Sequence, residues 1–228
     1  MMVHCRRKAL FDDWRYEQAK RHADARRAVE LCEDLCSEKV IGELYDLGCD
    51  TDPPAIVVAP AMPVGETRNA LGRGFAAWLA RETSLGVETR IVQTNAVKRD
   101  LITNPYQRLA HSPTFEGPVQ QGGSYILADD VFTMGGTLAA LRGFIESRGG
   151  NVVAITTIAE KEGLHVPISL DPETKTALYA VHGGVLASLV PQRIGFGLDC
   201  LTQPEGRFLL REPSADAIRA GLDRARDC

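Results

Sequence analysis

The fold of this chain is decided by the stretch Tyr125-Ile-Leu-Ala-Asp-Asp-Val-Phe-Thr-Met-Gly-Gly-Thr-Leu138. Its apolar start predicts a buried strand, and two adjacent acids, Asp129 and Asp130, stand where that strand ends. A turn that contains glycines follows, and a helix is expected to begin near Thr137. A strand, a short loop and a helix in this order indicate an α/β protein.

Each part of this stretch has a chemical use. Glycines allow backbone N–H groups to close around an anion, and the amino terminus of a helix adds positive partial charge. A phosphate monoester therefore fits at residues 135–137. Adjacent carboxylates at the end of a strand can accept hydrogen bonds from the vicinal hydroxyls of a ribose. The stretch thus predicts a site for ribose 5-phosphate.

Similar units recur on both sides of this stretch. Short apolar runs alternate with amphipathic helices, and we expect the strands at 55–59, 87–92, 125–128 and 152–158 and the helices at 67–82 and 137–148. Continuous Val, Ile and Leu strands separated by helices are typical of a parallel sheet that is covered on both faces. We therefore expect a doubly wound, mainly parallel sheet with its ligand site beyond the carboxyl ends of the strands.

Helical segments flank the predicted core. Residues 9–45 show helical periodicity, and the two prolines of Asp50-Thr-Asp-Pro-Pro54 end this region because they cannot continue a helix. We predict a helical N-terminal extension at 1–50, a core at 51–162, and a C-terminal part at 163–228 that completes the core and forms a hood. The polar stretch 15–27 is either a solvated helix face or a surface for a partner subunit.

Composition argues against several other classes of protein. The 228 residues are 44% hydrophobic and 25% charged, which is typical of a globular chain and not of a disordered one. A net charge of -4 provides no broad positive field, so nucleic acid is an unexpected partner. The sequence has no apolar run of signal-peptide or membrane-spanning length, and we expect a cytoplasmic protein with no membrane partner.

The six cysteines indicate reduced thiols, because their spacing forms no compact disulfide framework. A structural zinc ion shared by Cys32, Cys36 and Cys49 is a weaker alternative, since tight Cys-x-x-Cys pairs are absent.

The stretch at 125–138 resembles the phosphoribosyl-pyrophosphate signature of type I phosphoribosyltransferases. That signature is an apolar strand, two acids, two further residues, a Thr or similar residue, and then T-G-x-T. The resemblance implies that Asp129 and Asp130 bind the ribose hydroxyls, act in catalysis, and hold Mg²⁺ directly or through water. It assigns the 5′-phosphate to Thr133, Met134, Gly135, Gly136 and Thr137. Met134 departs from the usual Thr, so one hydroxyl contact to the phosphate is lost.

Two further segments support the resemblance. Residues 59–65 stand where the family places the loop that binds pyrophosphate, which implies a ligand role for Ala61 and Met62. The Arg73-Gly-Phe75 segment and the following Leu79-Ala80 resemble a helix of the competence-associated phosphoribosyltransferase-like proteins. Arg73 could reach a phosphate from this helix, and Arg108 resembles another arginine of the same proteins.

The long polar stretch 93–123 matches the position of a flexible loop that closes over pyrophosphate in type I enzymes. In this interpretation Lys98 and Arg99 carry the positive charge that acts on the departing pyrophosphate. Lys161 stands where some members of the family place a basic residue against the base. Ordinary surface lysines and arginines are the alternative explanation for all three residues.

The resemblance implies a transferase of nucleotide metabolism that moves ribose 5-phosphate from phosphoribosyl pyrophosphate to an unidentified, nucleobase-like acceptor, with Mg²⁺ as cofactor. Oxopurines are less favoured as acceptors, because Thr133 stands where the family members that act on oxopurines carry an Asp as the base. The first alternative is a non-catalytic regulator of the same fold that senses phosphoribosyl pyrophosphate or a nucleotide. The second is a helical interaction scaffold built on residues 9–45. A homodimer is compatible with either role.

Overall fold

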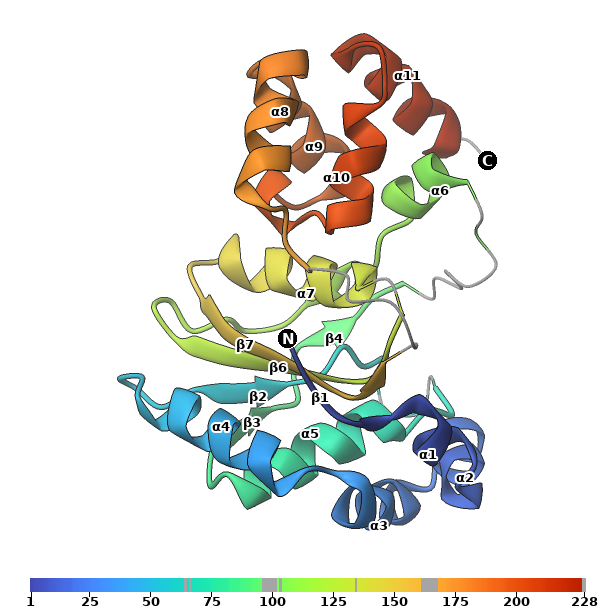
Figure 1. Cartoon of the computed structure of the whole chain (residues 1–228), viewed down its shortest axis with the longest axis vertical. Helices are drawn as coiled ribbons and strands as arrows, with labels where there is room; N and C mark the ends of the chain where they lie inside the picture. Colours follow the sequence, from blue (N-terminus) through green and yellow to red (C-terminus); the bar gives the residue numbers. More distant parts are fainter. Residues whose placement is uncertain are drawn as a thin grey trace. The chain divides into compact units, whose positions relative to one another are not determined.

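The computed structural model describes residues 1–63, 65, 67–95, 102, 104–133, 135–160 and 168–226 (Figure 1). The chain divides into two compact units. The first unit comprises Met1–Thr94, Phe115–Thr133 and Arg148–Leu164, and the second comprises Asn95–Thr114, Met134–Ser147 and His165–Cys228. The predicted boundaries near residues 50 and 162 follow sequence composition, and they stay predictions.

The first unit contains a five-stranded sheet with the strand order β1-β7-β6-β2-β3, in which every pair of neighbours is parallel. Its strands are β1 (Met2–Arg6), β2 (Ile56–Val58), β3 (Gly86–Glu88), β6 (Ser124–Phe132) and β7 (Asn151–Glu160). A separate antiparallel pair joins β4 (Val92–Gln93) to β5 (Phe115–Glu116). The predicted α/β class, a mainly parallel sheet with flanking helices, is confirmed.

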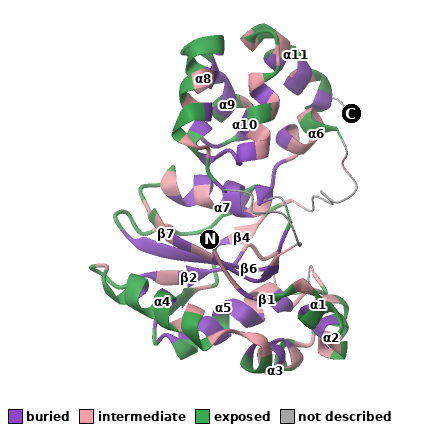
Figure 2. Ribbon diagram, in the orientation of Figure 1, coloured by how far each residue is buried: buried purple, intermediate pink, exposed green. Residues whose placement is uncertain are grey.

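Strand β6 occupies the centre of the sheet, and the first part of its sequence is buried, as the apolar pattern predicts. Tyr125, Ile126, Leu127 and Ala128 are each no more than 1% exposed. Figure 2 shows β6 mainly in the colour of buried residues. Ile126 and Ala128 belong to the buried core of this unit. Both acids stand near the start of helix α5 (Leu71–Glu82): the Asp129 Oδ1 lies 3.8 Å from the position of a Cβ at Gly72, and Asp130 accepts a hydrogen bond from Asn69, just before this helix.

Five helices accompany the sheet in the described part of the first unit. They are α1 (Arg7–Phe11), α2 (Trp14–Arg21), α3 (Ala25–Leu35), α4 (Glu38–Cys49) and α5 (Leu71–Glu82). Helices α4 and α5 pack on the sheet, and α3 packs on α5 (Figure 1). Strand β1 was not predicted, because its five residues contain no long apolar run. It pairs with β7 at one edge of the sheet, where His4 is buried.

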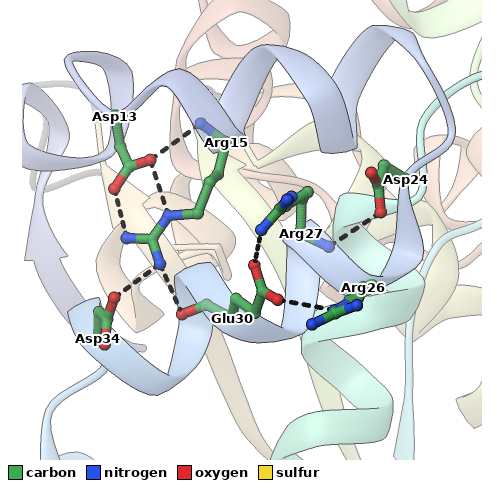
Figure 3. A network of polar contacts seen from close by, with 7 residues as sticks. All are labelled: Asp13, Arg15, Asp24, Arg26, Arg27, Glu30 and Asp34. Carbon is green, nitrogen blue, oxygen red and sulfur yellow. Dashed lines mark hydrogen bonds and ion pairs between the residues drawn. The ribbon is translucent and has the colours of Figure 1, made fainter.

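The polar stretch 15–27 makes its contacts within the chain (Figure 3). Asp13 caps α2 by accepting a hydrogen bond from the Arg15 N–H at 2.9 Å, and its carboxylate also pairs with the Arg15 guanidinium at 2.6 Å. The same guanidinium reaches α3, where it donates to the Glu30 carbonyl at 3.2 Å and to Asp34 at 2.6 Å. These contacts hold α2 against α3, so the stretch is more than a solvated face.

The second unit is helical in its described part. Its elements are α6 (Pro105–Ala110), α7 (Gly136–Glu146), α8 (Pro172–His182), α9 (Val185–Ile194), the 3₁₀ helix η2 (Leu198–Cys200), α10 (Gln203–Leu210) and α11 (Ala215–Arg226). Asp171 caps α8 through a 2.6 Å hydrogen bond from the Thr174 N–H, as its position before Pro172 predicts. None of the helices among the described residues is both long and apolar enough to cross a membrane.

The cysteines placed in the described chain carry free thiols, as predicted. Cys32 is buried in α3, Cys36 is half-buried, and Cys49 is exposed at the end of α4. Within the part of the chain that the structure describes, no group of three or more His, Cys, Asp or Glu side chains is placed to hold a metal ion.

The close packing of α3 on α5 depends on Gly74, because a Cβ at this residue would lie 2.6 Å from the Ala28 Cβ. We expect Gly74→Ala to lower the free energy of unfolding by about 1–3 kcal/mol through overpacking. Gly42→Ala on α4 is the matched control, since a Cβ there meets nothing within 4 Å. We expect the free energy of unfolding of this control to rise by about 0.4–1 kcal/mol. Urea unfolding of both variants tests the contact, and a Gly74→Ala protein as stable as wild type would contradict it.

Candidate functional site

The acid pair lies at the carboxyl end of β6, the edge at which parallel sheets bind their ligands. Asp130 is 6% exposed, and Asp129 is half-buried. Each carboxylate is oriented by the next backbone N–H: Asp129 Oδ1 accepts from Asp130 at 2.8 Å, and Asp130 Oδ1 accepts from Val131 at 2.7 Å. These local bonds fix the carboxylates without using their remaining oxygens.

A cation from the N-terminal region completes this site. Lys20, near the end of α2, donates from Nζ to Asp130 Oδ2 and forms an ion pair with it. Tyr16, one turn earlier on the same helix, is buried, which turns this face of α2 inward. Burial lowers the pKa of Lys20, but the charge and hydrogen bond of Asp130 together with the charge of Asp129 outweigh this effect, and the pKa is raised overall. Lys20 is therefore a charged ammonium at neutral pH.

Asn69 holds the same carboxylate from the loop before α5. Its Nδ2 donates to Asp130 Oδ2 at 3.2 Å, while its Oδ1 accepts from the Leu71 N–H at 3.0 Å at the start of α5. Asn69 thus fixes the beginning of the helix and the orientation of the acid with one side chain. Two backbone hydrogen bonds of 2.8 Å tie this loop to the end of α2, from Ala70 to the Ala19 carbonyl and from Ala23 to the Arg68 carbonyl.

The electrostatics of the two acids differ. Burial and the charge of Asp130 raise the pKa of Asp129 to about 7, although the ammonium of Lys20 opposes this change. Asp129 can therefore exchange a proton near neutral pH. Among the described residues, its Oδ1 accepts the Asp130 N–H, and its Oδ2 receives no donor.

The loop after β2 was predicted to bind pyrophosphate, and its carbonyl groups face the rest of the first unit. The Ala61 carbonyl accepts from the Gln93 N–H at 2.9 Å, and the Met62 carbonyl accepts from Arg73 Nη2 at 2.5 Å. Arg73 Nε is buried and has no hydrogen-bond partner among the described residues. Arg73 thus braces this loop, and the ligand roles of Ala61, Met62 and Arg73 stay predictions.

A cavity of about 490 Å³ lies beside this loop in the first unit. Its lining is mainly small and apolar, and includes Val29, Ala59, Ala61, Asn69, Arg73 and Ala77. Asn69 contributes both to the cavity and to the contact with Asp130. The cavity is therefore next to the acid pair's supporting loop.

Of the predicted phosphate-binding residues, Gly135, Gly136 and Thr137 lie at the start of α7 in the second unit, and Thr133 belongs to the first unit. Gly135 has a φ of 72°, a left-handed conformation that favours glycine, and α7 begins at the next residue. In the described residues no side chain caps this amino terminus, and the Gly135 carbonyl accepts from Ala139 at 2.8 Å. Thr133 is exposed. The roles of Thr133, Gly135, Gly136 and Thr137 toward phosphate stay predictions.

The roles of the remaining predicted site residues stay predictions. Arg108 lies in the last turn of α6 in the second unit. Lys98, Arg99, Met134 and Lys161 lie outside the described residues.

Sequence reasoning missed Lys20 and Asn69. Two signals could have identified them: Lys20 follows Tyr16 by four residues on an otherwise polar helix, and Asn69 stands two residues before α5. Neither signal names the partner, because Lys20 and Asn69 are 110 and 61 residues away from Asp130.

The Asp130 carboxylate does not fit direct coordination of Mg²⁺ in this arrangement. Mg²⁺ binds carboxylate oxygens at about 2.0–2.1 Å in octahedral geometry. At Asp130, Oδ2 already receives Lys20 and Asn69, and Oδ1 receives the Val131 N–H. A metal ion at this carboxylate would have to displace the ammonium of Lys20.

Comparison with known proteins gives two curated relatives. The chain is 37% identical over 210 residues to Protein TraN of Escherichia coli, a match that covers 92% of this chain and 46% of that protein. It is 32% identical over 130 residues to an uncharacterized protein of Haemophilus influenzae, covering 57% of this chain and 28% of that protein. The chain thus spans less than half the length of the curated relatives it matches. No protein-family model matches it.

The expectation of a cytoplasmic location was wrong. It rested on the absence of apolar runs of signal-peptide or membrane-spanning length, and the similarity to Protein TraN contradicts it.

Solved structures similar to the chain are type I phosphoribosyltransferases. An adenine phosphoribosyltransferase matches with a TM-score of 0.35 and 18% identity over 55% of this chain and 72% of the other. The orotate phosphoribosyltransferase from Aeropyrum pernix matches with a TM-score of 0.32 and 19% identity over 60% and 77%. Likenesses this distant concern the fold, and no activity follows from them.

The raised pKa of Asp129 predicts a pH-dependent stability. Its pKa is raised from 3.8 to about 7 in the folded protein, so between these values the folded state keeps a proton that the unfolded chain releases. Rising pH therefore lowers the contribution of this group to the free energy of unfolding. We expect Asp129→Asn, which cannot titrate, to become progressively more stable relative to wild type from about pH 4 to pH 7.

Urea unfolding at several pH values measures this difference. Asp46→Asn on the exposed face of α4 is the control for removal of a surface carboxylate. Parallel stability curves for wild type and Asp129→Asn would show that Asp129 does not hold its proton in the folded state.

Proposed function

We propose that the protein binds phosphoribosyl pyrophosphate at the end of β6 and transfers its ribose 5-phosphate to a nucleobase-like acceptor, with release of pyrophosphate. The observation that carries this proposal is the pair of oriented, poorly exposed carboxylates on the central strand of a parallel sheet. They stand at the edge where such sheets bind ligands. The sequence that follows them resembles the phosphoribosyl-pyrophosphate signature, with Met134 in place of the usual Thr.

Asp129 and Asp130 would accept hydrogen bonds from the ribose hydroxyls. Ionised carboxylates are pure acceptors, and a pair at adjacent positions suits two vicinal hydroxyl groups. Their negative charge also suits the reaction, because the ribose ring becomes positively charged as its bond to pyrophosphate weakens. Asn69 and the backbone keep the Asp130 carboxylate in one orientation, which reduces the cost of ordering it on binding.

In the proposed transfer the bond between ribose C1 and the pyrophosphate oxygen breaks, and both electrons leave with pyrophosphate. An acceptor nitrogen forms the new bond to C1 and releases its proton. No protein nucleophile is needed. The sequence assigns the 5′-phosphate to residues 133–137, the departing pyrophosphate to Lys98 and Arg99, and the base to Lys161.

A non-catalytic regulator that binds phosphoribosyl pyrophosphate or a nucleotide is the second candidate. The observation that favours it is the ion pair of Lys20 with Asp130, which balances one carboxylate charge before any ligand arrives. A site with balanced charge supports binding, but it provides less negative charge toward a cationic transition state. Pyrophosphate release with any acceptor distinguishes the two candidates.

Replacing both acids tests the proposed site. We expect Asp129→Asn with Asp130→Asn to weaken phosphoribosyl pyrophosphate binding at least about a hundredfold, or about 2.7 kcal/mol, because amides accept weaker hydrogen bonds than carboxylates. Titration calorimetry measures the loss. Once an acceptor is found by screening nucleobases for pyrophosphate release, kcat/KM should fall by a similar factor.

The surface variant Asp46→Asn is the matched control and should bind as wild type does. Circular dichroism and urea unfolding establish that the double variant is folded. Unchanged binding in the folded double variant would reject the proposed function.

A further inference from the structure

The acid pair at the end of β6 faces a positive charge that the chain itself supplies. Lys20 forms an ion pair with Asp130, whose side chain is only 8% exposed. We infer that Lys20 is the resident cation of this site. Its ammonium occupies the position on Asp130 that a divalent metal ion would need, so a bound sugar phosphate contacts Lys20 instead of a metal ion. The exclusion of a metal ion follows from the geometry alone, whereas the contact between Lys20 and a sugar phosphate rests on the proposed function.

Lys20 is held in position from two sides. On one side, the Arg15 guanidinium fastens α2 to α3 through Asp34 and the Glu30 carbonyl. On the other, the backbone bond from Ala70 to the Ala19 carbonyl joins the residue before Lys20 to the loop that carries Asn69. An ordinary surface lysine samples many rotamers, but this one extends from an anchored backbone to a buried partner.

The chain occupies three of the roughly four acceptor positions of Asp130. Lys20 Nζ and Asn69 Nδ2 both donate to Oδ2, and the Val131 N–H donates to Oδ1. A divalent ion bound to Oδ2 would lie within a few ångströms of the ammonium, where like charges repel. A metal ion would also need several additional oxygen ligands, whereas Asn69 presents its Nδ2 donor to Asp130 and commits its Oδ1 to α5. The arrangement therefore selects an ammonium over a metal ion.

The ammonium retains capacity for a ligand. It carries three N–H donors, and the contact with Asp130 uses one of them. The Lys20 side chain is 31% exposed, so a phosphate or hydroxyl oxygen can reach it from solvent. A sugar phosphate offers both kinds of group: its hydroxyls can donate to the carboxylates, and its anionic oxygens can accept from Lys20.

Binding of Mn²⁺ to the full chain without any sugar phosphate tests the exclusion of metal. Electron paramagnetic resonance measures free Mn²⁺ during titration of wild type, Lys20→Met, Lys20→Met with Asp130→Asn, and Lys39→Met. Lys39 is an exposed lysine on α4 that pairs with Glu43, and its substitution is the matched control. We expect Lys20→Met to bind Mn²⁺ at least about tenfold more tightly than wild type and the control, and Asp130→Asn to remove this gain.

Two results would overturn the exclusion of metal. One is a wild-type protein that already binds Mn²⁺ as tightly as Lys20→Met does. The other is a folded Lys20→Met protein that gains no affinity, as a merely structural ion pair would predict. Lys20→Arg keeps the positive charge and should therefore gain no affinity for Mn²⁺. Urea unfolding shows whether each variant is folded.

Titration of the protein with ribose 5-phosphate, in EDTA and in excess Mg²⁺, tests whether Lys20 replaces a metal ion in binding the sugar phosphate. We expect wild type to bind with affinities within about twofold of each other in the two buffers, and Lys20→Met to favour Mg²⁺ by at least about tenfold. Wild-type binding that requires Mg²⁺ would overturn the role of Lys20 toward the ligand. Absence of binding in both buffers would reject the proposed function and with it the ligand role of Lys20, while the Mn²⁺ titration would still decide whether Lys20 excludes metal.

Discussion

Two adjacent carboxyl groups at the end of a central strand impose a cost that the rest of the first unit must offset. Each loses hydration on burial, and their charges repel each other. The structure responds differently at the two positions. Asp130 receives a lysine, an amide and a backbone N–H, whereas the pKa of Asp129 is raised to about 7. The pair is therefore tolerated because one acid is paired and the other can hold a proton.

The arrangement of the N-terminal helices follows from this requirement. Lys20 can reach Asp130 only if α2 is fastened beside the loop before α5, and the Arg15 contacts with α3 provide the fastening. Helix α3 in turn packs closely on α5, where Gly74 leaves room for Ala28. Asn69 connects α5 to the acid, because its side chain accepts from the Leu71 N–H and donates to the Asp130 carboxylate. A chain of contacts thus runs from the α3–α5 packing to the charge at the end of β6.

Local patterns predicted the parts of the fold that depend on neighbouring residues. The apolar run before Asp129 identified β6, and Asp171 before Pro172 identified the start of α8, because burial and capping act over a few positions. Strand β1 was not predicted, since its partner β7 lies far along the chain and its own sequence is short and has no long apolar run. Lys20 and Asn69 were missed for the same reason. A polar residue becomes part of a site only through a partner that tertiary folding brings to it.

The ion pair of Lys20 with Asp130 makes the N-terminal helices part of the candidate site. Composition separates residues 1–50 from the strands that follow, and the signature at 125–138 directs attention to the core alone. The ion pair joins these regions, because the cation comes from α2 and the carboxylate from β6. Removing the N-terminal helices would leave Asp130 beside Asn69 without its counter-charge, and an unpaired, poorly hydrated carboxylate favours either a proton or a metal ion. The chemistry available at the end of β6 is thus set as much by the N-terminal helices as by the strand that carries the acids.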